Sequence, residues 1–290
     1  MTGPLVRSLF GKGNTTIAKD FSANRAGRSC LAVATISRNK GESQEMTTVK
    51  HIMDTLEQYA PVVLAEEWDH VGLMVGDRTK PVSKVLLALD VTQAVAEEAV
   101  ELGCEMIISH HPFLFHPLYA VDLNTAKGRT VAYLLQHGIT VYSAHTNLDY
   151  AVQGVNDSLR MMAEYAAKGG SVGLQEFAQN LKRALHAPVV KIYGPEQKFH
   201  EPVGKVVVSC GAFDGDFSKI EEANANVLVT GEMKYNQAVD LMEQGVCVVE
   251  AGHYDTEKIV LPRLQSYLQE KYPAVAFHLT TTSFPVSIVL

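Results

Sequence analysis

The chain has 290 residues, of which 47% are hydrophobic, and a formal net charge of −7, which is enough apolar material for one large domain or two smaller ones. Residues 1–45 hold seven Lys and Arg against three acids, a net of +4, so residues 46–290 carry about −11. No apolar run in the sequence approaches the 18 residues of a membrane span, and so acidic a body argues against a nucleic-acid partner, whose binding needs clustered Lys and Arg.

The first half of the chain alternates between helical and strand patterns. Apolar residues at helical spacing predict a helix over 48–59, and 66–73 is expected to form a turn before an apolar segment that ends at Gly76. The next ranges have the patterns of a strand, a helix, a strand, a helix and a strand: 85–91, 93–102, 105–109, 130–136 and 139–144. This alternation predicts a parallel sheet covered by helices.

The second half repeats this alternation. Its ranges predict a strand, a helix, a strand, a long helix and a strand: 227–229, 237–243, 246–251, 255–271 and 274–279. Asp255 is expected to cap the long helix. The helix and strand that precede His110 match those that precede His253, and the helix and strand before His145 match those before His278. We interpret this as an internal duplication, with one lobe over 46–170 and a second over 171–290.

The expected fold class is therefore α/β, with two similar halves whose mostly parallel sheets are covered by helices. Ligands of open α/β sheets bind at the carboxyl ends of the strands. Two such sheets facing each other can place their ligands in one cleft, so we expect a metal site between the halves.

Residues 1–45 are rich in Ser, Asn, Gly and Arg and lack sustained periodicity. Three interpretations compete: a disordered extension, a transit peptide, or a mis-called start, since Met46 would open the first helix naturally; we favour the last. The four cysteines form no C-x-x-C pair, so a disulfide framework is not expected and a reducing compartment is. We expect a cytoplasmic protein, or a mitochondrial one if the transit peptide is real.

Two adjacent histidines, His110 and His111, end an apolar run and stand before a proline. Side chains alternate direction along a strand, so these neighbours suit two ions better than one. His253 and Glu257 are spaced i, i+4 where a strand meets a helix, which puts an imidazole and a carboxylate on one helical face. Asp149 can bridge two ions, although its spacing equally fits a turn or a helix cap.

These three histidines and two carboxylates form a mixed nitrogen and oxygen set, which suits two divalent ions such as Zn, Fe, Mn, Co or Ni rather than Ca or Mg. His145 has three roles open to it: ligand, hydrogen-bond partner of a ligand, or proton carrier. We favour a position behind the ligands, from which it can also carry a proton. The histidines without acidic or histidine neighbours are expected to be structural: His70, His116, His137, His186, His200 and His278.

Taken together, the motifs resemble the dinuclear-metal-centre, toroidal hexamer family, known as GTP cyclohydrolase 1 type 2 homologs or NIF-three-like proteins. The resemblance covers 46–290 and rests on five segments: 68–73, 109–113, 145–149, 229–232 and 252–257. It implies the NIF-three-like two-domain fold, a ring of six subunits and two metal ions per subunit. The implied ligands are His110, His111, Asp149, His253 and Glu257, with Trp68, Asp69 and Glu232 beside them.

Two departures from the family stand out. The family usually has Asn where this chain has His70, so the Trp68–Asp69 turn is expected to contact its ligand differently. Some members also carry a large domain inserted between the halves. Here only residues about 171–204 lie between them, so this chain is the compact form.

Two functions from different classes follow. The first is a metal-dependent hydrolase in which metal-activated water attacks a nucleotide-like or other small substrate, with His145 as the catalytic proton carrier. The family label suggests a purine nucleotide, but the sequence contains no G-x-x-x-x-G-K-S phosphate loop. The second is a metal-binding ring that docks protein partners in a regulatory role and catalyses nothing.

Overall fold

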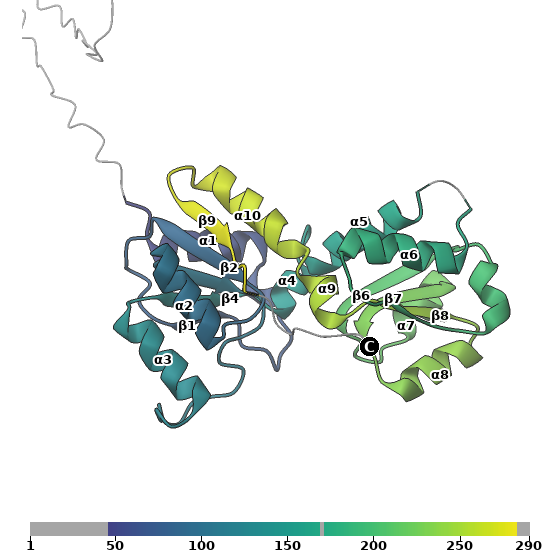
Figure 1. The fold of residues 1–290 in the computed structure, drawn as a ribbon, viewed down its shortest axis with the longest axis horizontal. Coiled ribbons are helices and arrows are strands. Elements are labelled where there is room, and N and C mark those ends of the chain that lie inside the picture. The colour runs from purple at the N-terminus through teal and green to yellow at the C-terminus, as the bar shows by residue number, and fades with distance from the viewer. Residues whose placement is uncertain (1–45, 169–170, 283–290) are drawn as a thin grey trace, which may run out of the picture. The chain divides into compact units, whose positions relative to one another are not determined.

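The computed structural model describes residues 46–168 and 171–282 (Figure 1). The three interpretations of residues 1–45 lie outside this range. Within it, no helix is both long and apolar enough to cross a membrane. Cys104 and Cys247 are buried and free, which fits the behaviour of a thiol as a small apolar side chain.

The first sheet has five strands in the order β1-β4-β3-β2-β9. These strands are β1 (Gly72–Val75), β2 (Lys84–Ala88), β3 (Met106–Ser109), β4 (Thr140–Ser143) and β9 (Ala276–Leu279). All pairs are parallel except β1 with β4. Val85 and Leu87 of β2 pack in one core with α1 (Val49–Tyr59) and α10 (Val260–Lys271). Leu86 and Ala88 point to the other face, where they pack with α2 (Gln93–Leu102) and α3 (Ala126–Gln136).

The second sheet has four strands in the order β5-β8-β7-β6. These are β5 (Lys191–Tyr193), β6 (Val206–Ala212), β7 (Val227–Glu232) and β8 (Cys247–Glu250), all parallel except β5. Helices α5 (Val155–Ala166) and α6 (Leu174–Leu185) pack on one face, and α7 (Ser218–Ala223) and α8 (Tyr235–Glu243) on the other. The described residues also include four short helices: η1 (Val62–Leu64), α4 (Thr146–Tyr150), η2 (Glu196–His200) and α9 (His253–Glu257).

The two sheets share one topology, which confirms the prediction of similar α/β halves. In each, three consecutive parallel strands are joined by helices on one face, and the strand that precedes them adds antiparallel beside the third. The matching of segments made from the sequence was wrong by one strand–helix unit. Topology pairs β4 with β8, so the counterpart of His253 is His145 rather than His110.

The C-terminal strand was expected in the second half, but β9 pairs with β2 of the first sheet. Phe277 lies beside Val85 in this pairing and both are buried, so β9 covers what would otherwise be an exposed sheet edge. Conversely, α5 precedes residue 170 and yet packs against β6. The chain therefore passes to the second sheet before α5 and returns to the first with α10 and β9 (Figure 1).

The single long helix expected over 255–271 is two helices, α9 and α10. Pro262 explains the break, because it has no N–H to donate to the Lys258 carbonyl and is tolerated only in the first turn of a new helix. Asp255 does not cap the start, since α9 begins at His253 after Gly252, whose φ is 94°. Asp255 lies inside the helix and forms an ion pair with Lys258 at 2.5 Å.

Candidate metal centre

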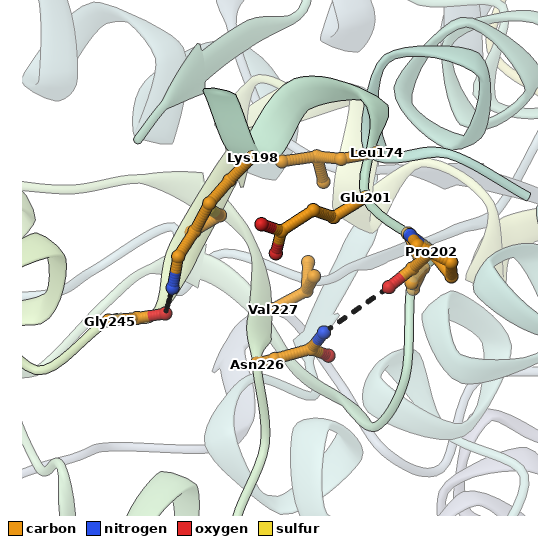
Figure 2. A pocket seen from close by; sticks show the side chains of 9 residues that line it. Leu174, Lys198, Glu201, Pro202, Asn226, Val227 and Gly245 are labelled. Atoms are coloured by element: carbon orange, nitrogen blue, oxygen red, sulfur yellow. Dashed lines mark hydrogen bonds between the residues drawn. The ribbon is translucent and has the colours of Figure 1, made fainter. Parts of the chain in front are cut away.

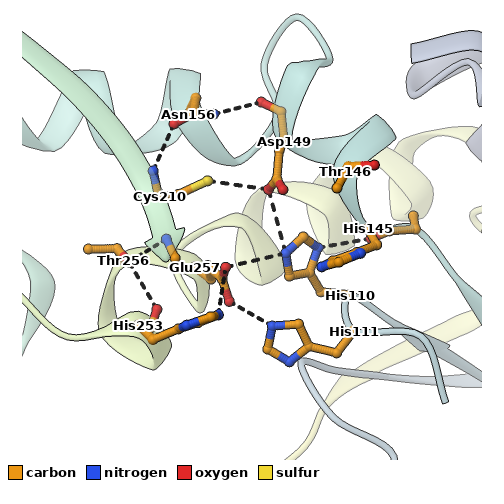
Figure 3. A network of polar contacts seen from close by, with 12 residues as sticks. His110, His111, His145, Thr146, Asp149, Asn156, Cys210, His253, Thr256 and Glu257 are labelled. Carbon is orange, nitrogen blue, oxygen red and sulfur yellow. Dashed lines mark hydrogen bonds and ion pairs between the residues drawn. The ribbon is translucent and has the colours of Figure 1, made fainter. Parts of the chain in front are cut away.

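Four imidazoles meet where strands of the two sheets end (Figure 3). His110 and His111 follow β3, His145 follows β4, and His253 opens α9 after β8. The ring centroids of His110 and His111 are 5.1 Å apart, and those of His111 and His253 are 5.4 Å apart. The parallel strands carry their side chains to one edge, as expected for a site at the carboxyl ends.

Each imidazole is held at Nδ1 by an oxygen outside the cluster. The four acceptors are Ala144 O for His110 at 2.9 Å, Asp90 Oδ1 for His111 at 2.8 Å, Asp69 Oδ1 for His145 at 3.0 Å and Glu232 Oε1 for His253 at 3.1 Å. Because carbonyl and carboxylate oxygens only accept, Nδ1–H donates in every case. The lone pair of each neutral ring is therefore on Nε2, which is how proteins prepare histidines for a metal.

Glu257 lies among three of these Nε2 atoms. Its Oε1 is 3.1 Å from His253 and 3.7 Å from His110, and its Oε2 is 2.9 Å from His111. Asp149 approaches from α4, with Oδ1 3.5 Å from His110 Nε2. The Glu257 side chain is only 4% exposed, so a carboxylate with three imidazoles around it is held away from water.

Two groups of side chains have the spacing of metal ligands: His110, His111 and His145 form one, and His111, His253 and Glu257 form the other. Among the described residues, His110 Nε2 and Glu257 Oε2 are buried without a hydrogen-bond partner. Glu257 Oε2 is near enough to His111 for an ion pair but is not aligned for a hydrogen bond. Buried donor atoms that converge and lack partners fit a divalent cation of the Zn, Fe or Mn class.

The carboxylates and imidazoles of the cluster change one another's pKa values. Burial raises the pKa of Glu257, but the close approach of His110, His111 and His253 outweighs this effect and leaves the pKa well below its usual range. Burial disfavours protonated His111, yet Asp90 and Glu257 raise its pKa to about 10. The hydrogen bond to Glu257 raises the pKa of His253 to about 9. Without a cation, the cluster thus holds protons that a metal ion would replace.

The His145 ring behaves differently from these two. Burial and the neighbouring charge of His110 lower its pKa, and the contact with Asp69 only partly compensates. Burial likewise raises the pKa of Asp149. His145 is therefore the imidazole in this cluster that favours the neutral form, which can bind a cation or accept a proton.

The description of the Duf34/NIF3 (NGG1p interacting factor 3) family matches residues 47–287, most of the chain. This protein belongs to the Duf34/NIF3 family. It is 31% identical over 230 residues to a GTP cyclohydrolase 1 type 2 homolog of Clostridium acetobutylicum, covering 72% of this chain and 85% of that protein. It is 28% identical over 246 residues to the NGG1-interacting factor 3 of Saccharomyces cerevisiae, covering 71% and 85%.

A solved structure of a Bacillus cereus protein related to NIF3 has the same fold. The two superpose with a TM-score of 0.77 at 23% identity, covering 85% of this chain and all of the other. At this level of sequence identity, the comparison supports a shared fold and nothing about function. The expected α/β class and the resemblance to the NIF-three-like proteins are therefore both confirmed.

The two similar halves of this Duf34/NIF3 chain each place a histidine and an acid four residues apart at a short helix. His145 is the N-cap of α4 after β4 and Asp149 lies on that helix, whereas His253 and Glu257 are the first and last residues of α9 after β8. In both halves the histidine Nδ1 donates to a carboxylate, Asp69 in one and Glu232 in the other. The sequence analysis matched His253 with His110 instead of His145, so it did not detect this equivalence.

Three residues were expected beside the ligands. Asp69 holds His145 and also accepts from the Thr146 hydroxyl at 2.6 Å. Glu232 holds His253. Trp68 is 56% exposed, and its ring lies edge-on to His145 with centroids 6.0 Å apart. All three lie at the cluster.

His70, where this chain departs from the family pattern, contacts Asp69 through its backbone. Its backbone N–H, which every residue but proline has, donates to Asp69 Oδ1 at 2.8 Å. A change of side chain at this position leaves that contact available. The remaining histidines that we expected to be structural belong to neither ligand group.

Two side chains that support the cluster escaped the sequence analysis. Asp90, which follows β2, accepts from His111. Cys210 on β6 is buried and directs its thiol at Asp149 Oδ1, 3.3 Å away. Asp90 lies near the end of the strand predicted over 85–91 and could have been found by the same reasoning as His110. Cys210 could not, because nothing in the sequence shows which strand of the second half faces Asp149.

A small pocket lies beside the second sheet, away from the cluster (Figure 2). It is lined by Lys198, Glu201, Asn226 and Cys247 among others, and Lys198 donates to the Gly245 carbonyl at 2.7 Å. Its volume is about 40 Å³. A space of this size holds ordered water rather than a metabolite, so we assign it no function.

Proposed function

We propose that this Duf34/NIF3 protein is a dinuclear metal-dependent hydrolase. The observation that carries the proposal is the convergence of four Nε2 atoms and two carboxylates, each imidazole being fixed from behind at Nδ1. Structural histidines have no need of this arrangement. It is the second layer of contacts that accompanies metal ligands in proteins.

The predicted ligands His110, His111, Asp149, His253 and Glu257 would hold two ions. The two groups with ligand spacing share His111, and Glu257 contacts imidazoles of both. When bound, a pair of divalent cations supplies stabilisation of developing oxygen charge and activation of water for hydrolysis. The protein's own part is to fix the ligands and exclude bulk water, which the burial of His110 and Glu257 supports.

His145 has two proposed roles that one experiment separates. As a member of the first ligand group it is placed to bind an ion. As a neutral imidazole oriented by Asp69 it can also accept a proton from water and return it to the leaving group. In His145→Gln, loss of one metal equivalent would identify a ligand. Retained metal with lost turnover would identify the proton carrier predicted from the sequence.

The substrate is proposed from the relatives. Several of them, including the Clostridium protein, are named as GTP cyclohydrolase 1 type 2 homologs. We therefore propose a nucleotide-like or other small substrate. The exposed Trp68 ring beside His145 supports this choice, since a planar heterocycle can stack on an indole.

The first test is metal content per chain by mass spectrometry, on protein purified without added metal. We expect about two equivalents in the wild type and a sharp loss in Asp149→Ala. Asp54→Ala removes an exposed carboxylate that pairs only with Lys50 and should leave the metal unchanged. Metal-loaded protein is then screened against nucleotides, phosphoesters and amides. Absence of metal that reconstitution cannot restore, or no turnover with both ions present, would reject the hydrolase.

A second function has one observation in its favour. Large apolar side chains stand exposed on the segment after the histidine pair and beside the cluster: Trp68, Phe115, Leu118, Tyr119, Val121 and Leu123. Exposed apolar side chains concentrated in one segment suit a protein interface, and the yeast relative is named for an interaction. The alternative is therefore a homohexameric ring that docks protein partners without catalysis. Light scattering tests the hexamer, and partner capture that survives His110→Ala/His111→Ala would favour docking.

A further inference from the structure

An open hollow of about 430 Å³ lies beside the cluster of histidines and carboxylates, on the side of Asp90. Its lining includes Asp90, Thr92, His111, Phe113 and Lys127. His111 belongs to both: it lines the hollow, while its Nε2 lies 2.9 Å from Glu257 Oε2. A molecule at the metal centre can therefore extend into this space.

Lys127 brings a positive charge to the hollow. Its Nζ donates to the Phe113 carbonyl at 2.7 Å and stands 4.2 Å from the centre of the Phe113 ring. Within residues 46–168 and 171–282, no carboxylate lies within 4.0 Å of this ammonium group. An ammonium has three N–H donors, so two remain for a ligand.

The position of Lys127 is not explained by the helix that carries it. It is the second residue of α3, where the helix dipole disfavours a cation. Partial burial also lowers its pKa, which the charge of Asp90 opposes. Both effects make this an unfavourable place for a lysine that only faces solvent, and an anion bound at the ammonium group would offset them.

Other groups around the hollow agree with an anion. Thr92 caps α2, a ten-residue helix, so the positive end of that helix faces the same region. Asp90 is the one carboxylate in the lining, and its Oδ1 already accepts from His111 at 2.8 Å. Residues 46–290 as a whole carry about −11, so a lysine that forms no ion pair beside the cluster is a local exception to the charge of the body.

We propose that this hollow binds an anionic group of the substrate, a phosphate or a carboxylate, through the Lys127 ammonium. The inference rests on the proposed function, because it takes the anion to be part of the molecule that reacts at the metal centre. Lys127 then selects substrates by charge and holds them beside His111, while Phe113 and its carbonyl keep the ammonium in place.

The test titrates methyl phosphate and acetate, in separate calorimetric experiments, into four proteins: wild type, Lys127→Met, Lys127→Arg and Lys271→Met. Methionine keeps an apolar stem over the Phe113 ring but has no charge. Lys271 also lies over an aromatic ring, at 5.6 Å from Tyr267, on α10, and is the matched control. Metal content and thermal melting are measured on every sample.

We expect at least one of the two anions to bind the wild type. Lys127→Met should weaken its binding by about tenfold or more, the usual effect of losing a charged hydrogen bond. Lys127→Arg should restore most of the binding, Lys271→Met should change nothing, and metal content should be the same in all four. The anion that responds distinguishes a phosphate site from a carboxylate site.

Three results would overturn the inference: no binding of either anion to the wild type, equal binding by Lys127→Met, or equal weakening in Lys271→Met. Each can be obtained with metal present, in which case the hydrolase proposal survives. If no metal can be loaded, the hydrolase proposal fails instead. The same titrations on metal-free protein then still decide whether Lys127 binds an anion.

Discussion

His111 Nε2 and Glu257 Oε2 lie 2.9 Å apart, although one follows β3 of the first sheet and the other ends a helix after β8 of the second. The chain between them forms most of the second lobe. A cation held by both side chains therefore joins the two sheets. Because such a site exists only in the folded chain, metal binding is expected to stabilise the protein as a whole.

Asp90→Asn should weaken metal binding about 10- to 100-fold, the usual effect of losing a carboxylate behind a histidine ligand. The Asp90 carboxylate accepts a hydrogen bond from His111 Nδ1, and its negative charge makes Nε2 of the same ring a better metal ligand. The asparagine side chain lacks this charge. Competition with a chromogenic chelator measures the change. Asp77→Asn is the control, because Asp77 also accepts hydrogen bonds but only from Thr79 in an exposed turn. Equal affinities in both variants would exclude a supporting role for Asp90.

Melting temperatures of metal-free and metal-loaded protein should diverge as the pH rises from 7 to 10. In the metal-free fold the pKa of His111 is about 10 and that of His253 about 9, against about 6.5 in an unfolded chain. Their protonated forms therefore stabilise the fold fully below pH 6.5, and this contribution is lost as the pH rises through 9 and 10. A bound cation needs neutral imidazoles, so its affinity rises over the same interval.

Thermal scans across this pH interval, with and without saturating Zn²⁺ or Mn²⁺, measure the difference in melting temperature between metal-loaded and metal-free protein, here called the gap. Glu257 does not contribute to it, because a lowered carboxyl pKa affects stability only on acidification. In His111→Gln/His253→Gln the gap should stay constant with pH. A gap that narrows toward pH 10 in the wild type would contradict the assignment of these imidazoles as ligands.

Gly211→Ala should lose metal and destabilise the protein. Gly211 has φ 58°, and a Cβ placed there would be 2.3 Å from Glu257 Oε1 and 3.2 Å from His253 Nε2. The left-handed backbone alone costs about 1–2 kcal/mol for a residue with a Cβ. Gly103→Ala provides the control, since its φ is 69° but its Cβ would meet only Lys84 Nζ at 3.6 Å.

Both variants are compared by melting temperature and metal content. Destabilisation in both with metal loss confined to Gly211→Ala would show that the close approach, and not the backbone strain, matters for the site. Full metal content in Gly211→Ala would mean that Glu257 moves without consequence and is not a ligand.

Although it missed β5, β6 and α7, the sequence predicted β2, β3 and β4 of the first half and β7 and β8 of the second, because a buried parallel strand is a continuous apolar run with a clear helix on either side. It also brought together His110, His111, His145 and His253, because strand ends share one edge of a sheet. It did not place β9. Pairing between distant strands depends on which sheet edge is open, and that property belongs to the assembled fold.

Other misses have specific causes. Pro262 was visible in the sequence and should have divided the helix at 255–271, but the periodic apolar pattern on both sides hid the break. The matching of the halves failed because similar apolar strands follow every Gly stop. Only the antiparallel edge strands, β1 and β5, define where each half begins.

Phe277→Ala should destabilise the fold by about 3–5 kcal/mol, the usual cost of truncating a buried aromatic side chain. Phe277 is 5% exposed and packs in the core shared by β2, α1 and α10, so β9 is expected to hold the returning chain on the first sheet. His278→Ala, on the other face of the same strand, is the control and should change stability by less than about 1 kcal/mol. Chemical denaturation followed by circular dichroism measures both. Equal effects would show that β9 contributes through its backbone alone, and metal content below the transition should be unchanged because no ligand lies on this strand.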